Sequence, residues 1–224
     1  MQVALFGGSF DPPHRGHVAL ARLARERFAL DRILVAPVGA QPLKPDSAPV
    51  SFEDRLAMTR LAFAAEPGVE VSLLDSPRED GRSNYTVDTV EALRRDLGPN
   101  DALFCILGAD SLLTIRKWHR PADLLLACDF IVGARPGFEL DDAEAALPRE
   151  IQARPIPTEL PATRLLELTS PDGRRSRLYL LTDLNEDISA TEIRAALRGG
   201  KASERVLSPE VMEYIRAHRL YRHL

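Results

Sequence analysis

The sequence predicts a doubly wound, Rossmann-like α/β domain with a parallel sheet, followed by a small helical C-terminal part. Short apolar runs alternate with amphipathic stretches along much of the chain, which is typical of strands joined by helices that cover both faces of a parallel sheet. A length of 224 residues, with 45% hydrophobic and 28% charged residues, suits one globular domain with a substantial core. We therefore expect residues 1–224 to form a single domain.

The alternation itself gives the order of the first elements. Apolar runs predict strands at Val3–Phe6, Arg32–Ala36, Val69–Leu73, Leu103–Leu107 and Phe130–Gly133. Amphipathic stretches predict helices at Gly16–Phe28, Phe52–Ala64, Val87–Leu97 and Pro121–Ala127. Ligands of such sheets bind beyond the carboxyl ends of the strands, so site residues are expected in the loops that follow them.

The later part of the chain is interpreted from its turn residues. Glu139–Ala153 is expected to be helical, and a stretch with three prolines, Arg154–Pro161, follows it. Two apolar runs on either side of the turn Ser170-Pro171-Asp172-Gly173 predict a β-hairpin over residues 163–182.

Two helices are expected in a C-terminal part over residues 189–224. Ser189 is the expected N-cap of the first helix, and Glu192 three residues later would complete a capping box. Ser208 is the expected N-cap of the second helix, with Pro209 at its first position.

Composition excludes several classes of protein. A net charge of −4 argues against nucleic-acid binding, which needs a basic surface. No apolar run approaches the length of a membrane span, and the N-terminus leads into a strand, so neither a membrane partner nor a signal peptide is expected. Cys105 and Cys128 lie in apolar runs and are interpreted as buried free thiols of a reducing compartment. We therefore expect a cytoplasmic location.

The most informative stretch is Gly7-Gly8-Ser9-Phe10-Asp11-Pro12-Pro13-His14-Arg15-Gly16-His17, between the first expected strand and helix. Its two glycines allow backbone N–H groups to approach an anion, and the start of the helix adds a partial positive charge. Two histidines three residues apart share one face if the helix begins at the first of them. This arrangement suits the phosphates of a nucleotide, although the chain contains neither a P-loop nor a G-x-G-x-x-G fingerprint.

The same stretch resembles the H-x-G-H signature of the nucleotidyltransferase superfamily, in the form found in bacterial nicotinate mononucleotide adenylyltransferases. A second segment, Ile188–Arg194, resembles the superfamily's I-S-x-T-x-x-R motif. The resemblance implies a nucleotidyltransferase fold and transfer of the adenylyl group of ATP to nicotinate mononucleotide, giving deamido-NAD and pyrophosphate in NAD biosynthesis. It implies His14, His17 and Arg194 as catalytic residues, with Mg²⁺ bound to the triphosphate.

The resemblance also assigns residues to the two substrates. The ATP site would be formed by Gly7, Gly8, Phe10, His14, His17, Gly108, Asp110, Ile188, Ser189, Thr191 and Arg194. The mononucleotide site would be formed by Ser9, Lys44, Tyr85, Thr86, Trp118 and Arg135. No residue is assigned as a metal ligand, because Mg²⁺ is expected to arrive with ATP.

Some of these assignments have their own support in the sequence. Thr86 is a plausible N-cap in Tyr85-Thr86-Val87-Asp88-Thr89, which is similar to the family's Y-T-x-D-T motif. Trp118 has polar neighbours, which favours a partly exposed site over the core, and the resemblance implies that it stacks on the nicotinate ring. Lys44 lies on the proline-rich loop Pro37–Pro49, and Arg135 is equally consistent with a structural role.

The chain departs from the family's pattern at two places. Leu43 stands where the family commonly has histidine, which affects the expected geometry of the proline-rich loop. The hairpin over residues 163–182 is interpreted as an insertion, which would either extend the sheet or contact a second copy, so a homo-oligomer is an open alternative.

Three other functions are weighed against this one. Phosphopantetheine adenylyltransferases share both phosphate motifs but are shorter and lack the features around Trp118 and Tyr85. Cytidylyltransferases share H-x-G-H but usually carry R-T-x-G-I-S-T, where this chain has Asn185-Glu186-Asp187-Ile188-Ser189. A non-catalytic nucleotide sensor is the third alternative, and the intact cations of both phosphate motifs argue against it.

Overall fold

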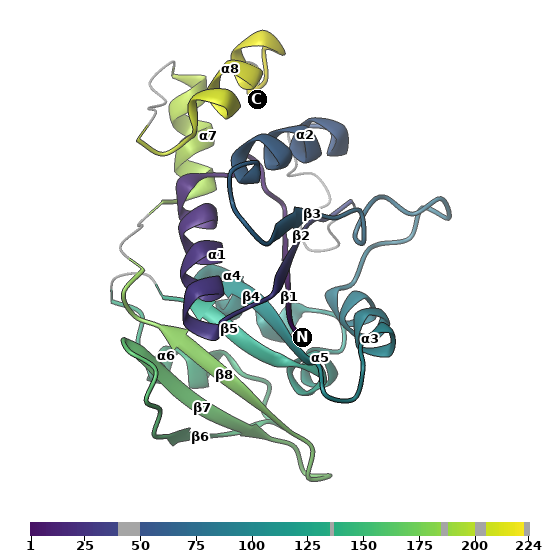
Figure 1. Ribbon diagram of the computed structural model, residues 1–224, viewed down its shortest axis with the longest axis vertical. Coiled ribbons are helices and arrows are strands. Elements are labelled where there is room, and N and C mark those ends of the chain that lie inside the picture. Colours follow the sequence, from purple (N-terminus) through teal and green to yellow (C-terminus); the bar gives the residue numbers. More distant parts are fainter. Residues whose placement is uncertain (40–49, 135–136, 185–187, 200–204, 222–224) are drawn as a thin grey trace.

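The computed structural model describes residues 1–39, 50–134, 137–184, 188–199 and 205–221, arranged around one eight-stranded sheet (Figure 1). The strands are β1 Gln2–Gly8, β2 Arg32–Pro37, β3 Val69–Val71, β4 Ala102–Gly108, β5 Asp129–Gly133, β6 Gln152–Ile156, β7 Thr163–Thr169 and β8 Arg175–Leu181. They lie in the order β3-β2-β1-β4-β5-β8-β7-β6. Every pairing from β3 to β8 is parallel, whereas β7 and β6 are added antiparallel at one edge.

Helices cover both faces of the sheet, as the sequence predicts for a doubly wound fold. They are α1 Arg15–Phe28, α2 Phe52–Phe63, α3 Thr86–Asp96, α4 Ala109–Leu113, α5 Pro121–Ala127, α6 Leu140–Ala146, α7 Ala190–Arg198 and α8 Pro209–Ala217, with a 3-10 turn at Ile115–Lys117. α1 packs on one face of the sheet, and α3, α4, α5 and α6 pack on the other (Figure 1).

The central strand β1 shows why the apolar runs are continuous. Val3 and Leu5 belong to one buried cluster, and Ala4 and Phe6 belong to the cluster on the opposite face. Successive side chains of a strand point to opposite faces, and both faces of this sheet are covered. A central strand of this kind therefore has no polar alternation, and its limits are set by the turns around it.

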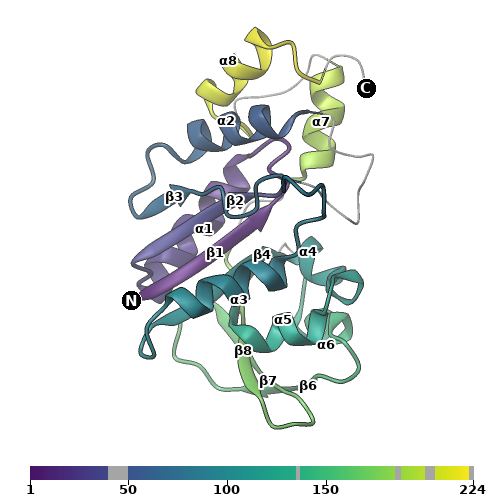
Figure 2. The same ribbon diagram turned by 90° about the vertical axis from the view of Figure 1, so that its right-hand side faces the viewer.

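The C-terminal part packs directly on α2. A third cluster joins Met58 of α2 to Ile193 of α7 and to Val211 and Ile215 of α8. Figure 2 shows α7 and α8 at the same end of the molecule as α2. The Ser208 cap is confirmed, because its hydroxyl accepts a hydrogen bond from the Val211 N–H at 3.3 Å. No described helix is both long and apolar enough to cross a membrane.

The long helix expected at Glu139–Ala153 is wrong beyond Ala146. Leu147 leaves the helix with ψ 148°, because the residue before a proline, here Pro148, is disfavoured in helical conformation. The chain then forms β6, which is paired on one side with β7 at the edge of the sheet. Such an edge tolerates Pro155, since a proline there needs no ladder partner for a missing N–H.

The hairpin predicted over residues 163–182 is confirmed, and it extends the sheet. β7 and β8 pair antiparallel over Thr163–Thr169 and Arg175–Leu181. β8 also pairs parallel with β5, with Ile131 opposite Tyr179. Of the two roles considered for this segment, the structure therefore shows sheet extension, with β8 as one of its inner strands.

Candidate active site

The candidate site lies at the carboxyl ends of β1 and β4, two neighbouring parallel strands near the middle of the sheet. The chain leaves β1 toward α1 on one face and leaves β4 toward α4 on the other, so the backbone opens between them. Two cavities of about 460 Å³ and about 230 Å³ occupy this opening. Both are lined by Gly7, Gly8, Ser9 and Ser111, so they meet at the ends of these two strands.

The smaller cavity contains the histidine pair. His14 is the N-cap of α1 and has an extended backbone. The helix therefore begins at Arg15, whereas the two histidines were expected to share one face only if it began at His14. The two rings nevertheless face each other, because those of His14 and His17 stack with centroids 3.6 Å apart. The His14 N–H donates to His17 Nδ1 at 3.1 Å.

The surroundings of His17 determine its protonation. Burial lowers the pKa of His17 well below its usual value, and the neighbouring His14 lowers it further. His17 is therefore neutral near pH 7 in the free protein. Because Nδ1 accepts the His14 N–H, the proton of the neutral ring is assigned to Nε2, which makes this side chain a hydrogen-bond donor.

Phe10 packs against His17 of this pair, although the sequence predicts that Phe10 belongs to the ATP site. It borders the smaller cavity, but only 1% of the residue is exposed and its ring belongs to the core. Its ring lies 5.0 Å from that of His17, with Phe6 and Phe63 also in contact. Its backbone has a φ of 48°, in the left-handed region. Phe10 thus packs the turn against the core, and its contact with ATP stays a prediction.

The second phosphate motif lines the same cavity from α7. Ile188, Ser189, Thr191 and Arg194 all border it. Ser189 is the N-cap, but its side chain makes no capping hydrogen bond, so the predicted capping box is wrong. Its hydroxyl is left at the cavity wall instead. Two motifs more than 170 residues apart in the sequence are brought to one cavity.

Arg194 is held by the turn that follows β1. Its Nη1 donates to the Asp11 carbonyl at 2.7 Å, and its Nη2 donates to Thr191 Oγ1 at 3.1 Å. The side chain is 21% exposed, so one part of the guanidinium is fixed while another remains accessible. Gly108 and the exposed Asp110, at the end of β4, complete this cavity.

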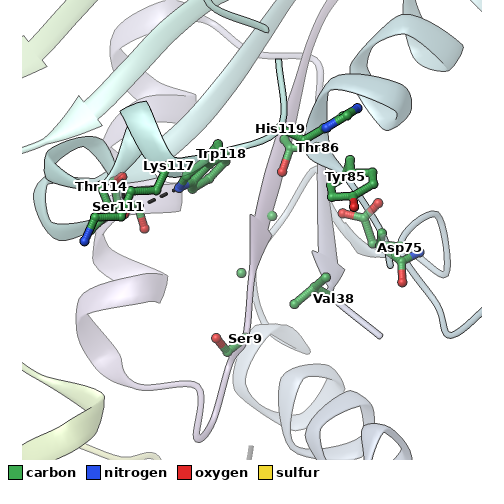
Figure 3. Close-up of a pocket in the computed structure, with 13 residues that line it drawn as sticks. Ser9, Val38, Asp75, Tyr85, Thr86, Ser111, Thr114, Lys117, Trp118 and His119 are labelled. Carbon is green, nitrogen blue, oxygen red and sulfur yellow. Dashed lines mark hydrogen bonds between the residues drawn. The ribbon is translucent and has the colours of Figure 1, made fainter. Parts of the chain in front are cut away.

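The larger cavity is lined by Ser9, Tyr85, Thr86 and Trp118, four of the six residues expected to bind a mononucleotide. Figure 3 shows Ser111, Thr114, Lys117 and Trp118 on one side of it, with Asp75, Tyr85 and Thr86 on the other. Trp118 is half-buried, as its polar neighbours predict, and its Nε1 donates to Thr114 Oγ1 at 3.4 Å. One of its faces packs against the core, which holds the indole in place beside the cavity.

The start of α3 differs by one residue from the prediction. Tyr85 is the N-cap and Thr86 is the first helical residue. The Tyr85 ring stacks on His119 with centroids 4.1 Å apart instead of capping the helix. The positive end of α3 and its first residues therefore border the larger cavity.

Asp75 is a cavity residue that the sequence did not single out. It is 2% exposed, and it accepts a hydrogen bond from the Thr89 hydroxyl. Burial raises the pKa of the Asp75 carboxyl, and the bond from Thr89 opposes that shift. Asp75 lies in an irregular segment between β3 and α3, where neither periodicity nor a motif indicates burial. Asn84, Lys117 and His119 line the same cavity and were not singled out either.

Arg55 of α2 was also missed, although it shapes the turn. It is 2% exposed, and its guanidinium donates to the carbonyl oxygens of Ser9 at 2.7 Å and Val38 at 2.8 Å. Burial lowers its pKa, and the nearby Asp11 opposes that shift. In the sequence it is one charged residue of an amphipathic helix, so its inward orientation has no local signal. It joins the loops that follow β1 and β2.

Some predicted features cannot be placed. Lys44, most of the proline-rich loop Pro37–Pro49, and Arg135 lie outside the described residues. Among the residues that are described, no group of three or more His, Cys, Asp or Glu side chains is arranged to hold a metal ion.

Comparison with known proteins identifies a family. The family model described as cytidylyltransferase-like matches residues 5–196. A protein from Laribacter hongkongensis, named a probable nicotinate-nucleotide adenylyltransferase, is 42% identical over 221 residues, covering 98% of this chain and 94% of its own. One of the same name from Geobacter sulfurreducens is 39% identical over 224 residues, covering 100% and 99%.

Solved structures agree on the fold. Plasmodium falciparum nicotinic acid mononucleotide adenylyltransferase complexed with NaAD superposes with a TM-score of 0.69, covering 98% of this chain and 97% of that one at 18% identity. The same enzyme complexed with APC gives a TM-score of 0.67, also at 18% identity. At this identity the likeness concerns the arrangement of the elements.

Proposed function

The chain belongs to the nicotinate-nucleotide adenylyltransferases of the cytidylyltransferase-like family, and we propose that it transfers the adenylyl group of ATP to nicotinate mononucleotide, giving deamido-NAD and pyrophosphate. Relatives of that name match it over nearly their whole length. The reaction belongs to NAD biosynthesis, and the two substrates are small molecules.

The observation that carries this proposal is the pair of joined cavities. One contains the phosphate-binding motifs with His14, His17 and Arg194, and the other contains Trp118 and the start of α3. They share Gly7, Gly8, Ser9 and Ser111. Two nucleotides bound in the two cavities would bring their phosphates together at this junction, which is the geometry that adenylyl transfer needs.

In the proposed reaction, a phosphate oxygen of the mononucleotide attacks the α-phosphorus of ATP. A bond forms between that oxygen and phosphorus, and the bond from phosphorus to the bridging oxygen of pyrophosphate breaks. The attacking oxygen is already anionic at neutral pH, so no general base is required. Catalysis then consists of positioning the two substrates and stabilising charge on the leaving pyrophosphate.

The three side chains proposed as catalytic, all of which line the smaller cavity, share that task differently. Arg194 contributes a guanidinium whose direction is fixed by Asp11 and Thr191. His17 contributes a donated hydrogen bond from a neutral ring in the free protein. His14, stacked on it, places a second imidazole beside the same phosphates. Ser9, at the junction of the cavities, is placed to contact the acceptor phosphate, and we propose the same contact for Lys44.

Mg²⁺ is proposed to enter with ATP. Hard oxygen ligands suit this ion, and the smaller cavity offers the carboxylate of Asp110 in addition to the triphosphate. When bound, the ion would offset negative charge on the triphosphate. We also propose a cytoplasmic location, which is supported by the two buried free thiols, Cys105 and Cys128.

The test uses the purified full chain with Mg²⁺ and four separate substrate pairs: ATP with nicotinate mononucleotide, with nicotinamide mononucleotide or with phosphopantetheine, and CTP with a polyol phosphate. Nicotinate mononucleotide should give deamido-NAD, identified by mass, together with an equal amount of pyrophosphate. Phosphopantetheine should give no product, and CTP with a polyol phosphate should release no pyrophosphate. Nicotinamide mononucleotide should react more slowly than the acid. Binding of ATP without release of pyrophosphate from it, whichever acceptor is present, would indicate the sensor instead.

A further inference from the structure

Tyr221 connects the C-terminal part to the glycine-histidine turn. It lies four residues after the end of α8, and only 3% of it is exposed. Its hydroxyl donates to Asp11 Oδ1 at 2.6 Å across a sequence separation of 210 residues. Asp11 itself is 3% exposed and belongs to the stretch between β1 and α1. A side chain from the far end of the sequence thus reaches the turn that forms the smaller cavity.

The same Asp11 holds Arg194. The guanidinium donates to the Asp11 carbonyl at 2.7 Å, and its Nη1 lies 4.0 Å from Asp11 Oδ2. The two carboxylate oxygens therefore face different partners, with the Tyr221 hydroxyl at Oδ1 and the Arg194 guanidinium at Oδ2. Because a carboxylate is planar, fixing one oxygen also fixes the direction of the other.

The buried carboxyl group of Asp11 needs a hydrogen-bond partner from within the protein, and Tyr221 is one. A polar group removed from water requires a hydrogen-bond partner, and Asp11 is almost fully removed from water. Burial and the neighbouring Asp11 raise the pKa of Tyr221, so its hydroxyl keeps the proton that it donates. The bond is therefore a constant feature of the folded protein over the neutral pH range.

We propose that Tyr221 is a positioning residue for ATP: through Asp11 it fixes the direction of the Arg194 guanidinium in the smaller cavity. The C-terminal part would then complete the nucleotide site in two ways, by supplying α7 and by orienting the Arg194 side chain. This role rests on the proposed function only in taking ATP as the ligand of that cavity. Tyr221 itself lines neither cavity and is not assigned a contact with substrate.

Tyr214 provides a matched control. It also belongs to the C-terminal part, and its hydroxyl also donates to a carboxylate, Asp54 Oδ1 of α2, at 2.9 Å. Asp54 lines neither cavity. Tyr214→Phe and Tyr221→Phe therefore each remove one tyrosine–aspartate hydrogen bond between the C-terminal part and the rest of the molecule. They differ in that one of those carboxylates also faces Arg194.

The experiment measures ATP binding by calorimetry without an acceptor, kcat and KM for both substrates, and the melting temperature. We expect Tyr221→Phe to raise the Kd and KM for ATP about 10-fold, the size of one lost hydrogen bond to a charged group. The KM for the mononucleotide should stay unchanged. Tyr214→Phe should leave all these constants within about twofold, while both variants lower the melting temperature by about 2–4 °C.

A double variant shows whether Tyr221 acts through Arg194. In an Arg194→Ala background the guanidinium is gone, so Tyr221→Phe should weaken ATP binding no further. If Tyr221→Phe does not fold, Asp11→Asn replaces it, since that change keeps an oxygen for the Tyr221 hydroxyl and removes the charge that faces Arg194. It should weaken ATP binding to a similar degree and lose that effect in the Arg194→Ala background.

Two results would overturn the proposal: equal ATP affinity in Tyr221→Phe and Tyr214→Phe, or a further tenfold loss in the double variant. Failure of the proposed function has a different signature. If the wild-type chain makes no deamido-NAD while the expected pattern of ATP affinities is seen, the acceptor is wrong and the role of Tyr221 stands.

Discussion

At the scale of single residues, His14 and His17 are adjacent in space but unequal in surroundings. His17 is packed on Phe10 and accepts a backbone N–H at Nδ1, whereas His14 is the N-cap of α1. Both rings border the cavity assigned to the triphosphate. Each is therefore expected to act on charge that develops during transfer, His17 through a hydrogen bond from its neutral ring.

Removing either imidazole should slow the chemical step. We expect His14→Ala and His17→Ala each to lower kcat roughly 100-fold, the scale of one lost contact to a developing oxyanion. Steady-state kinetics at saturating substrates checks this, with circular dichroism as the control for folding. Near-normal turnover in a variant that lacks both histidines would contradict their assignment.

The lowered pKa of His17 also predicts how stability depends on pH. A depressed pKa means that the unfolded chain binds the proton more readily than the folded one. The stability that neutral His17 contributes is therefore complete above its ordinary value of 6.5 and is lost as the pH falls below it. Urea unfolding between pH 7.5 and 5.5 should show a steeper loss in the wild type than in His17→Asn. Parallel pH profiles for the two proteins would refute this.

Trp118 is expected to report on the mononucleotide alone. A base stacked on an aromatic ring gains about 1–3 kcal/mol, so Trp118→Ala should raise the KM for the mononucleotide and leave that for ATP nearly unchanged. As the single tryptophan of the chain, it also provides a fluorescence signal for the same event. An unaltered KM with no fluorescence response to the mononucleotide would assign Trp118 to the core.

At the scale of secondary-structure elements, the start of α3 and the neighbouring Asp75 act on the same cavity in opposite directions. The N-terminus of α3 carries partial positive charge and favours an anion. Asp75 places a carboxyl in the same cavity, where an amide nitrogen could donate to it. Because Asp75 already accepts from Thr89 and burial raises its pKa, we expect the helix to decide between the acid and the amide.

The resulting prediction concerns the pyridine substituent. Nicotinate mononucleotide should exceed nicotinamide mononucleotide in kcat/KM by roughly 30- to 150-fold, equivalent to about 2–3 kcal/mol for a mismatched buried donor. Asp75→Asn should increase this preference, because it removes the carboxyl that repels an acid. Equal kcat/KM values for the two wild-type reactions would contradict the assignment of α3, even if adenylyl transfer itself were confirmed.

At the scale of the whole molecule, the site lies at one end of the strands, whereas the pairing and packing that stabilise the sheet extend along the whole length of the strands. β8 pairs with both β5 and β7, so the hairpin is part of this frame. The edge strands are β3, with three residues, and β6, which contains Pro155. Short and proline-containing edges oppose pairing with another sheet. A homo-oligomer remains a prediction, and its contacts are expected elsewhere.

A substitution in the core of the sheet should lower the free energy of unfolding without changing substrate binding. Leu166 of β7 is fully buried in the cluster beneath α5 and α6, so Leu166→Ala should lower the free energy of unfolding by about 2–5 kcal/mol. Leu113 of α4 is 53% exposed, and Leu113→Ala should change the free energy of unfolding by less than about 0.5 kcal/mol. Urea unfolding measures both. Leu166 lines neither cavity, so its variant should keep the wild-type KM values at low temperature, and a raised KM would contradict this separation.

The sequence by itself determined the features that depend on neighbouring residues. The period of apolar residues predicted β1 to β5 and the helices α1, α2, α3 and α5, because burial on one or two faces leaves a repeat that can be counted. The short helix α4 after β4 was not predicted. Turn residues predicted the β7–β8 hairpin, and Ser208 with Pro209 predicted the start of α8. The phosphate motifs, which are continuous in the chain, could be found in the same way. The helix expected over Glu139–Ala153 failed after Ala146, because Leu147 precedes a proline and the chain beyond it pairs with β7.

Only the tertiary structure decided which distant residues meet. Asp11 contacts Arg194 and Tyr221 across separations of 183 and 210 residues, and Arg55 reaches the turn from α2. Asp11 and Arg194 belong to motifs, but nothing in the sequence indicates that they meet, and Tyr221 and Arg55 are single side chains that no spacing rule marks. Their partners are determined by the order of strands in the sheet and by the packing of α7 and α8. The free energy of such contacts comes from burial, and burial is a property of the folded molecule as a whole.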